Sequence, residues 1–168
     1  MGMTNTLTSL RSGTYTIDPA RSAVRFTATH VFGLKPVDGT MAIRSGTVMV
    51  ADEPRRSTVS AEIDTASWAT DDPRRDKDVR GKRFLDTDRH PVIGFRSTRV
   101  VRGADGWQVV GVLSVRGGSC EVTLNLTEIA PDGFTATARV DRVAAGVGQG
   151  RAIVGRYVDV TLSIRLIG

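Results

Sequence analysis

Hydrophobic and polar residues alternate with a period of two through most of the sequence. The clearest run lies near the carboxyl end, where Val158, Val160, Leu162, Ile164 and Leu166 alternate with polar or charged residues. Such alternation is typical of a β-strand with one buried face and one solvated face. Similar runs cover residues 24–30, 37–50, 59–64, 93–97, 122–127 and 134–140, while residues 107–115 are apolar on both faces. The sequence therefore predicts an all-β protein of about eight antiparallel strands.

Only the 71–85 region departs from this alternation, and it predicts a short helix. Asp72 can accept hydrogen bonds from the first helical amides, and Pro73 suits the first helical position. Val79 and Phe84 provide an apolar edge. We expect Asp72 to Phe84 to form a short helix or helical turn that lies over one end of the strands, with Phe84 pointing inward.

The apolar faces of the strands must point toward a shared interior, in a closed barrel or a two-sheet sandwich. A barrel of eight strands is either filled by side chains or holds one small ligand. Several inward positions carry small residues, namely Ala28, Gly39, Ala61, Ala136 and Ala138. Small inward residues fit close packing of strands and an internal tunnel equally well.

The chain of 168 residues fits one domain. We expect residues 1–13 to form a flexible lead-in and residues 14–168 to form the barrel. No apolar run reaches the roughly 20 residues of a transmembrane segment, and the lead-in lacks the apolar core of a secretory signal. The lone cysteine, Cys120, excludes an internal disulfide, and together these features predict a cytoplasmic protein.

The net charge of +5 raises the question of a nucleic-acid partner. The basic residues between 74 and 89 alternate with aspartates, and no aromatic residues stand among them for base stacking. This pattern predicts a solvated surface of mixed charge and no nucleic-acid binding.

Few residues suggest chemistry. His30 ends an apolar strand face, so it is either a strand-end residue bonded to backbone or a polar anchor at a cavity mouth. Arg75, with Asp76 beside it, could orient a phosphate, or it could belong to an exposed ion pair. His90 precedes Pro91 in a turn. No catalytic motif or metal-ligand spacing is present, so we predict no metal and no cofactor.

An ordered set of motifs resembles the YceI-like proteins. Arg75-Asp76-x-Asp78-Val79, then Phe84-Leu85-Asp86, then His90-Pro91-x-Ile93-x-Phe95-x-Ser97 resembles their signature. Further matches are Ser22, Phe26, His30 and Gly39; Ile63, Ser67 and Thr70; Gly111-x-Leu113-Ser114-Val115-Arg116-Gly117; and Gly146-Val147. The resemblance extends from about Tyr15 to Ile167. The run Arg142–Val147 departs from it, since the family's Asp and Phe before the glycine are missing.

The resemblance implies a bacterial, lipocalin-like antiparallel barrel that holds a long isoprenoid or similar amphiphilic lipid without catalysis, for sequestration or transport. The ligand-binding residues it implies are Phe26, Ala28, His30, Met41, Ile63, Trp68, Arg75, Asp76, Phe84, Phe95, Leu113, Phe134 and Ala136. A homodimer is compatible with it. Two alternatives stay open: an enzyme that acts on a prenyl or other lipid through His30 and the Arg75–Asp76 pair, and a packed barrel that serves as a stress-related protein-interaction module.

Overall fold

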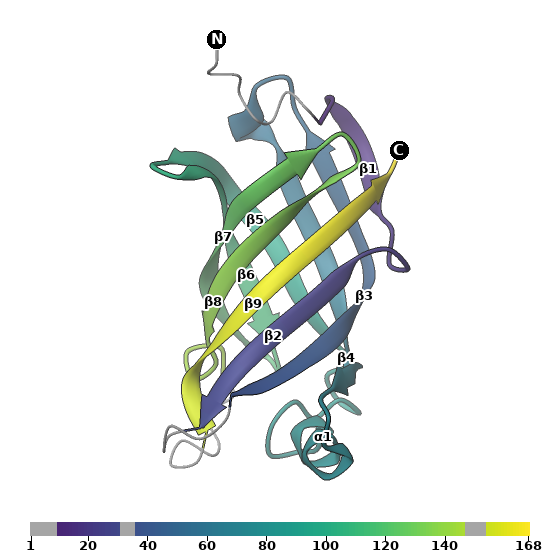
Figure 1. Cartoon of the computed structure of the whole chain (residues 1–168), viewed down its shortest axis with the longest axis vertical. Coiled ribbons are helices and arrows are strands. Elements are labelled where there is room, and N and C mark those ends of the chain that lie inside the picture. Colours follow the sequence, from purple (N-terminus) through teal and green to yellow (C-terminus); the bar gives the residue numbers. More distant parts are fainter. Residues whose placement is uncertain (1–9, 31–35, 147–153) are drawn as a thin grey trace.

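The computed structural model describes residues 10–30, 36–146 and 154–168, with side chains for all of these except 29–30 and 154–156. The described residues form nine strands and one α-helix (Figure 1). The strands are β1 (Gly13–Ile17), β2 (Ala23–His30), β3 (Val37–Val50), β4 (Thr58–Ala69), β5 (Val92–Gly103), β6 (Gly106–Val115), β7 (Gly118–Ala130), β8 (Gly133–Asp141) and β9 (Val154–Ile167). The helix is α1 (Pro73–Arg80), and a 3₁₀ turn, η2, spans Pro54–Arg56.

The sheet closes into an antiparallel barrel. Neighbouring strands pair in the order β1-β3-β2-β9-β8-β7-β6-β5-β4, and the pairing of β3 with β4 completes the ring. Strands β1 and β2 share one place in this ring. Strand β2 pairs with the first part of β3, and β1 pairs with its last part, while both also pair with β9. The predicted eight-stranded barrel is therefore confirmed.

Strand β1 is the element that the sequence analysis missed. It is separated from β2 by a turn that begins at Asp18, whose carboxylate accepts hydrogen bonds from Ala20 N and Arg21 Nε. Pro19 lies in this turn and has no amide to donate to a β-ladder. The chain therefore leaves the ring at Asp18 and re-enters it at Ala23.

Strand β3 continues without a break through Ser45-Gly46. The pairing of β3 with β4 shifts between Ile43 and Ser45, as in a β-bulge. A Cβ on Gly46 would lie 2.5 Å from Ile17 Cδ1. Glycine here serves the close approach of the Ile17 side chain, and the strand does not end.

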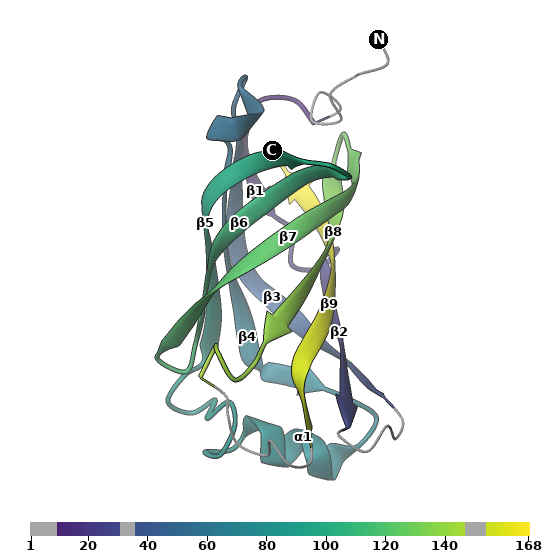
Figure 2. The ribbon, with the colours of Figure 1, turned by 90° about the vertical axis from the view of Figure 1, so that its left-hand side faces the viewer.

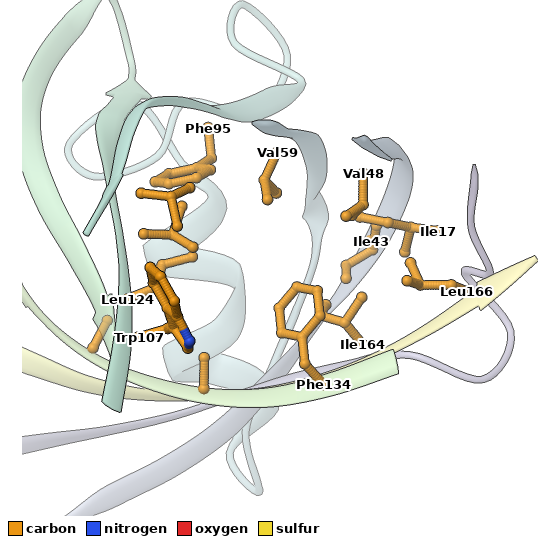
Figure 3. Close-up of a cluster of buried hydrophobic side chains, with 14 of the residues drawn as sticks. Ile17, Ile43, Val48, Val59, Phe95, Trp107, Leu124, Phe134, Ile164 and Leu166 are labelled. Atoms are coloured by element: carbon orange, nitrogen blue, oxygen red, sulfur yellow. The ribbon is translucent and has the colours of Figure 1, made fainter. Parts of the chain in front are cut away.

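The end of the barrel away from α1 is packed with apolar side chains. Figure 3 shows Trp107 and Leu124 on one side and Ile17, Ile164 and Leu166 on the other, all directed inward. Leu10 joins this core and is only 3% exposed. Leu10 lies within the predicted lead-in and packs against the barrel, while residues 1–9 lie outside the described part of the chain.

Helix α1 lies beneath the other end of the barrel (Figure 2). We call this end the α1 end. The helix begins as predicted, because Asp72 accepts hydrogen bonds from Arg74 N and Arg75 N and Pro73 takes the first position. It ends earlier than predicted, since Gly81 caps it and turns follow through residue 89. Phe84 lies in these turns and packs against buried apolar residues of the α1 end.

Candidate functional site: the barrel interior

The barrel encloses a cavity of about 120 Å³ whose lining side chains are all apolar. They come from β1 to β9 and comprise Ile17, Val24, Met41, Ile43, Val59, Ala61, Ile63, Ile93, Phe95, Leu113, Val122, Leu124, Phe134, Ala138, Val140, Val160, Leu162 and Ile164. An interior of this kind favours an apolar ligand, because every contact removes apolar surface from water. It offers no described hydrogen-bonding side chain.

A second depression of about 640 Å³ lies on the outer face of the sheet. Its lining includes Ser45, Thr47, Ser60, Glu62 and Arg96. These polar or charged side chains face water, and the depression is more open to solvent than the barrel interior, so it encloses an apolar ligand less completely. The enclosed cavity is therefore the better candidate site.

The inward residues around the middle of the barrel are less buried than those at its packed end. On β3, Ile43 is buried and Met41 is half-buried; on β9, Ile164 is buried and Leu162 is half-buried. On β6, Val109 is likewise buried and Leu113 is half-buried. Met41, Leu113 and Leu162 line the cavity, so their partial exposure reflects interior space. Side chains therefore do not fill this part of the barrel completely.

Five of the predicted site residues line this cavity. They are Met41, Ile63, Phe95, Leu113 and Phe134. Ala28 and Ala136 also point inward and are buried, but neither lies on the cavity wall. At Ala136, which is 0% exposed, neighbouring strands are already in close contact. Ala136 is therefore a small inward residue that allows close packing of the strands. Ala138 is a small inward residue that lines the cavity.

Phe26 and Trp68 form an aromatic pair near the α1 end. Their rings stack with centroids 4.0 Å apart and planes inclined by 22°. A Cβ on Gly39 would clash with the Phe26 ring and the Ala69 carbonyl oxygen, so glycine allows this ring to lie against β3. Phe26 is buried but does not line the cavity. The pair stands between the cavity and the α1 end.

The α1 end has its own buried cluster, made of Leu85, Ile93, Val115 and Ala145, which we call the α1-end cluster. Met41, Ile63, Trp68, Val79, Phe84, Leu113 and Cys120 pack against it. Ala145 belongs to the run that departs from the YceI-like pattern, and it is buried; Val147 lies outside the described residues. The cluster closes this end with small and medium-sized side chains.

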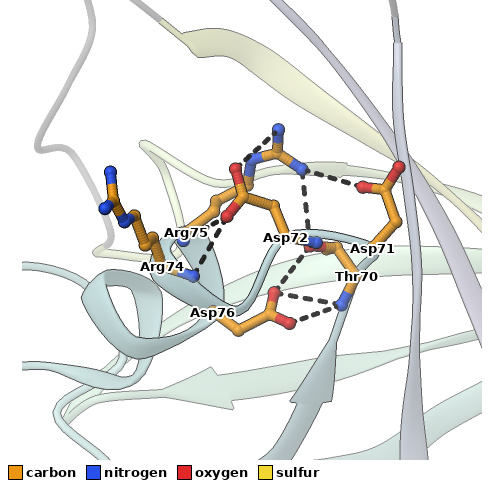
Figure 4. Close-up of polar contacts among 6 residues, drawn as sticks. All are labelled: Thr70, Asp71, Asp72, Arg74, Arg75 and Asp76. Atoms are coloured by element: carbon orange, nitrogen blue, oxygen red, sulfur yellow. Dashed lines mark hydrogen bonds and ion pairs between the residues drawn. The ribbon is translucent and has the colours of Figure 1, made fainter.

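Arg75 and Asp76 do not form the pair expected from their adjacency (Figure 4). Arg75 Nη1 lies 3.5 Å from Asp71 Oδ1 and donates to Thr70 Oγ1 at 3.3 Å, and Arg75 Nη2 lies 3.8 Å from Asp72 Oδ2. Asp76 accepts hydrogen bonds from Thr70, so the Thr70 hydroxyl contacts both side chains. A role of Arg75 and Asp76 in ligand binding stays a prediction.

Asp76 attaches α1 to the end of β4. Its carboxylate is 4% exposed and accepts from Thr70 N at 2.9 and 3.0 Å and from Thr70 Oγ1 at 2.7 Å. Burial alone would raise the pKa of Asp76, but the Thr70 hydrogen bonds and the positive charges of Arg80 and Arg75 hold it below its ordinary value of 3.8. The group is therefore a structural anion.

Two further candidates need separate treatment. His30 ends β2, and its side chain lies outside the described part of the structure. Cys120 is half-buried and packs against both interior clusters. Burial, followed by the negative charge of Asp141, raises the pKa of the Cys120 thiol, so the thiolate that would act as a nucleophile is disfavoured.

The sequence analysis did not name several cavity residues as site residues, although it placed them on inward faces. Ile93, Ala138, Val160 and Leu162 are the main examples. Alternation indicated the face on which they lie. It could not indicate which inward residues reach free space, since that depends on how opposite walls pack.

The described residues contain no group of three or more His, Cys, Asp or Glu side chains arranged to hold a metal ion. Within the same residues, no helix has the length and hydrophobicity needed to span a bilayer.

Curated relatives in Yersinia and Serratia share parts of this sequence. A UPF0312 protein of Yersinia pestis is 39% identical over 71 residues, which are 42% of this chain and 37% of that protein. A UPF0312 protein of Serratia proteamaculans is 27% identical over 121 residues, which are 67% of this chain and 63% of that protein. The matched segments thus span less than two thirds of these relatives' length.

Solved structures share the fold over most of the chain. The Burkholderia cenocepacia protein BcnA superposes with a TM-score of 0.74 at 22% identity, covering 90% of this chain and 99% of BcnA. A polyisoprenoid-binding domain from Saccharophagus degradans, implicated in plant cell wall breakdown, gives a TM-score of 0.68 at 13% identity, covering 90% and 97%. The model of the YceI-like domain matches residues 15–166. This chain therefore belongs to the YceI-like domain family.

Proposed function

We propose that this protein binds the apolar part of an isoprenoid or similar amphiphilic lipid inside its barrel and does not change it chemically. The observation that carries the proposal is the enclosed cavity with an entirely apolar lining. Burial of apolar surface contributes about 25 cal/mol per Å² and needs no specific chemistry in the ligand. The polyisoprenoid-binding domain that shares the fold supports this class of ligand.

The size of the cavity limits what can enter without rearrangement. About 120 Å³ is comparable to an engineered cavity of roughly 150 Å³ that accommodates benzene. A long chain therefore requires wall residues to move. Met41 and Leu113 are suited to this, because both are only half-buried and a methionine side chain adapts readily to a new shape.

Affinity should rise with chain length for as long as the barrel encloses the chain. At about 0.3 kcal/mol per heavy atom, 20 enclosed carbons give roughly 6 kcal/mol, which corresponds to tens of micromolar. Forty enclosed carbons give about 12 kcal/mol, near nanomolar. A ligand that stays half outside would show no gain from its second half.

The catalytic alternative has less support. It relied on His30 and on an Arg75–Asp76 pair, and Asp76 is instead bonded to Thr70. None of the side chains that line the cavity can act as a nucleophile or a general base. A ligand bound there would meet only hydrocarbon.

A titration with the 20-carbon alcohol geranylgeraniol, followed by intrinsic tryptophan fluorescence, tests the proposal. Ala138→Phe places a ring in the cavity, and Ala138→Leu fills it with less risk to folding. Thr137→Phe is the matched control, because the neighbouring Thr137 faces water. We expect at least about tenfold weaker binding in the Ala138 variants, wild-type binding in Thr137→Phe, and recovery of geranylgeraniol with unchanged mass.

Wild-type affinity in a folded Ala138→Leu variant would show that the ligand does not occupy the cavity. A change in the mass of the recovered alcohol would show that the protein is an enzyme. Either result would overturn the proposal.

A further inference from the structure

Two hydrogen-bond donors are buried without an acceptor. Among the described residues, Trp68 Nε1 and Arg80 Nε are the buried side-chain nitrogens for which no partner lies within hydrogen-bond distance. Folded proteins pair nearly all of their buried polar groups, so each exception calls for an explanation. An indole N–H and a guanidinium N–H can only donate. Each would be satisfied by an acceptor that the described part of the chain does not supply.

Trp68 lies where a ligand in the cavity would extend toward α1. It packs against the α1-end cluster together with Met41, Ile63 and Leu113, and these three side chains also line the cavity. Its ring is stacked on Phe26, which holds the plane of the indole. Trp68 therefore lies in the same cluster as three cavity-lining side chains, and its stacking on Phe26 orients the indole.

Arg80 belongs to the same end of the barrel. The Thr70–Asp76 hydrogen bonds attach α1 to the end of β4, two residues after Trp68. Val79, the neighbour of Arg80, packs against the same cluster as Trp68. Asp76 is the charged group that faces Arg80, and the Thr70 hydrogen bonds already engage its carboxylate. Arg75, by contrast, interacts with Asp71, Asp72 and Thr70.

We propose that Trp68, assisted by Arg80, binds an oxygen acceptor at the polar end of the ligand. The protein then prefers an acceptor-bearing amphiphile to a hydrocarbon of the same length, and an anionic acceptor such as a carboxylate or phosphate to a neutral one. Trp68 is a specificity-determining residue in this arrangement. The inference rests on the proposed function for the apolar part of the ligand.

Three probes share the same heptyl chain and differ at its end: octanoate, methyl octanoate and n-heptane. Together they separate the contributions of the chain, the oxygen acceptor and the negative charge to binding. Binding in the cavity is followed from the methyl resonances of Ile63 and Leu113, and hydrogen bonding from the ¹⁵N-coupled indole proton of Trp68. Trp107→Phe assigns the two indole signals. We expect octanoate and methyl octanoate to shift the Trp68 indole proton downfield, as a new hydrogen bond does, and n-heptane to leave it in place.

Trp68→Phe keeps an aromatic ring against Phe26 and removes the N–H. We expect its affinity for octanoate to fall at least about tenfold, as for a hydrogen bond to a charged group, while its affinity for n-heptane stays the same. Arg80→Gln should weaken octanoate more than methyl octanoate, because only octanoate carries a charge.

The outcomes distinguish this inference from the function on which it rests. If n-heptane binds but octanoate neither shifts the indole proton nor responds to Trp68→Phe, the inference is wrong and the proposed function stands. If none of the three probes changes the Ile63 and Leu113 resonances, both are overturned.

Discussion

Asp76 shows how an isolated residue pair can mislead. Neighbours in a helix point about 100° apart, so Arg75 and Asp76 form no direct pair and are linked through the Thr70 hydroxyl that both contact. Arg75 instead meets Asp71 and Asp72, and Asp76 meets Thr70. The charged residues at this place could be identified from the sequence. The contact of Asp76 with Thr70 could not be predicted, because it depends on the turn between β4 and α1.

Asp76→Asn should destabilise the protein by roughly 1.5–3 kcal/mol, because the carboxylate accepts buried charge-assisted hydrogen bonds that an amide satisfies only in part. Denaturant unfolding measures this free energy. Asp71→Asn is the matched control: its side chain is 95% exposed, and a change there should stay within about 0.5 kcal/mol. Equal effects from the two substitutions would contradict the structural role of Asp76.

The same residue predicts a dependence on pH. Because the pKa of Asp76 is lower in the folded state than its ordinary 3.8, its contribution is complete above the unfolded pKa and is lost as the pH falls through the folded pKa. The difference in unfolding free energy between wild type and Asp76→Asn should be constant from about pH 7 to 5 and should shrink below about pH 4. A difference that grows in acid would mean that burial wins and the pKa is raised.

The positions of helices and strands could be predicted from the sequence wherever nearby residues determine the structure. Asp72 and Pro73 indicated the start of α1, and alternation located each long strand. Strand β1 escaped because its five residues are too short for a clear period, and because its pairing with β3 and β9 is entirely non-local. Strands β1 and β2 together fill one position of the barrel. The sequence indicates this only through Pro19, which interrupts the strand pattern.

Loss of the helix cap should affect α1 and leave the strands intact. Asp72→Ala removes the acceptor for Arg74 N and Arg75 N and should cost about 1 kcal/mol. Hydrogen exchange measures this locally: the amides of α1 should exchange about fivefold faster, and those of β6 and β7 should be unchanged. The control is Asp78→Ala, an exposed aspartate near the other end of the helix. If Asp78→Ala speeds exchange in α1 as much as Asp72→Ala, the cap is not what holds the helix.

For the whole molecule, alternation and family resemblance were enough to predict a closed antiparallel barrel, but they left open whether it is hollow. The alternation of apolar and polar residues on which strand pairing depends can be read directly from the sequence. Interior space depends on how side chains from opposite walls meet, so Ala136 is tightly packed while Ala138, two residues later on β8, borders the cavity. The same limit applies to the α1 end, where the Thr70–Asp76 hydrogen bonds attach α1 to the end of β4.

The central claim is that an apolar ligand occupies the barrel interior, and intermolecular NOEs test it most directly. In a sample with labelled isoleucine and leucine methyl groups and unlabelled geranylgeraniol, the account predicts NOEs from the ligand to Ile63 and Leu113, which line the cavity. It predicts none to Ile167, which is 53% exposed on the outside of the molecule. NOEs to Ile167 without any to Ile63 and Leu113 would place the ligand on the surface and contradict the account.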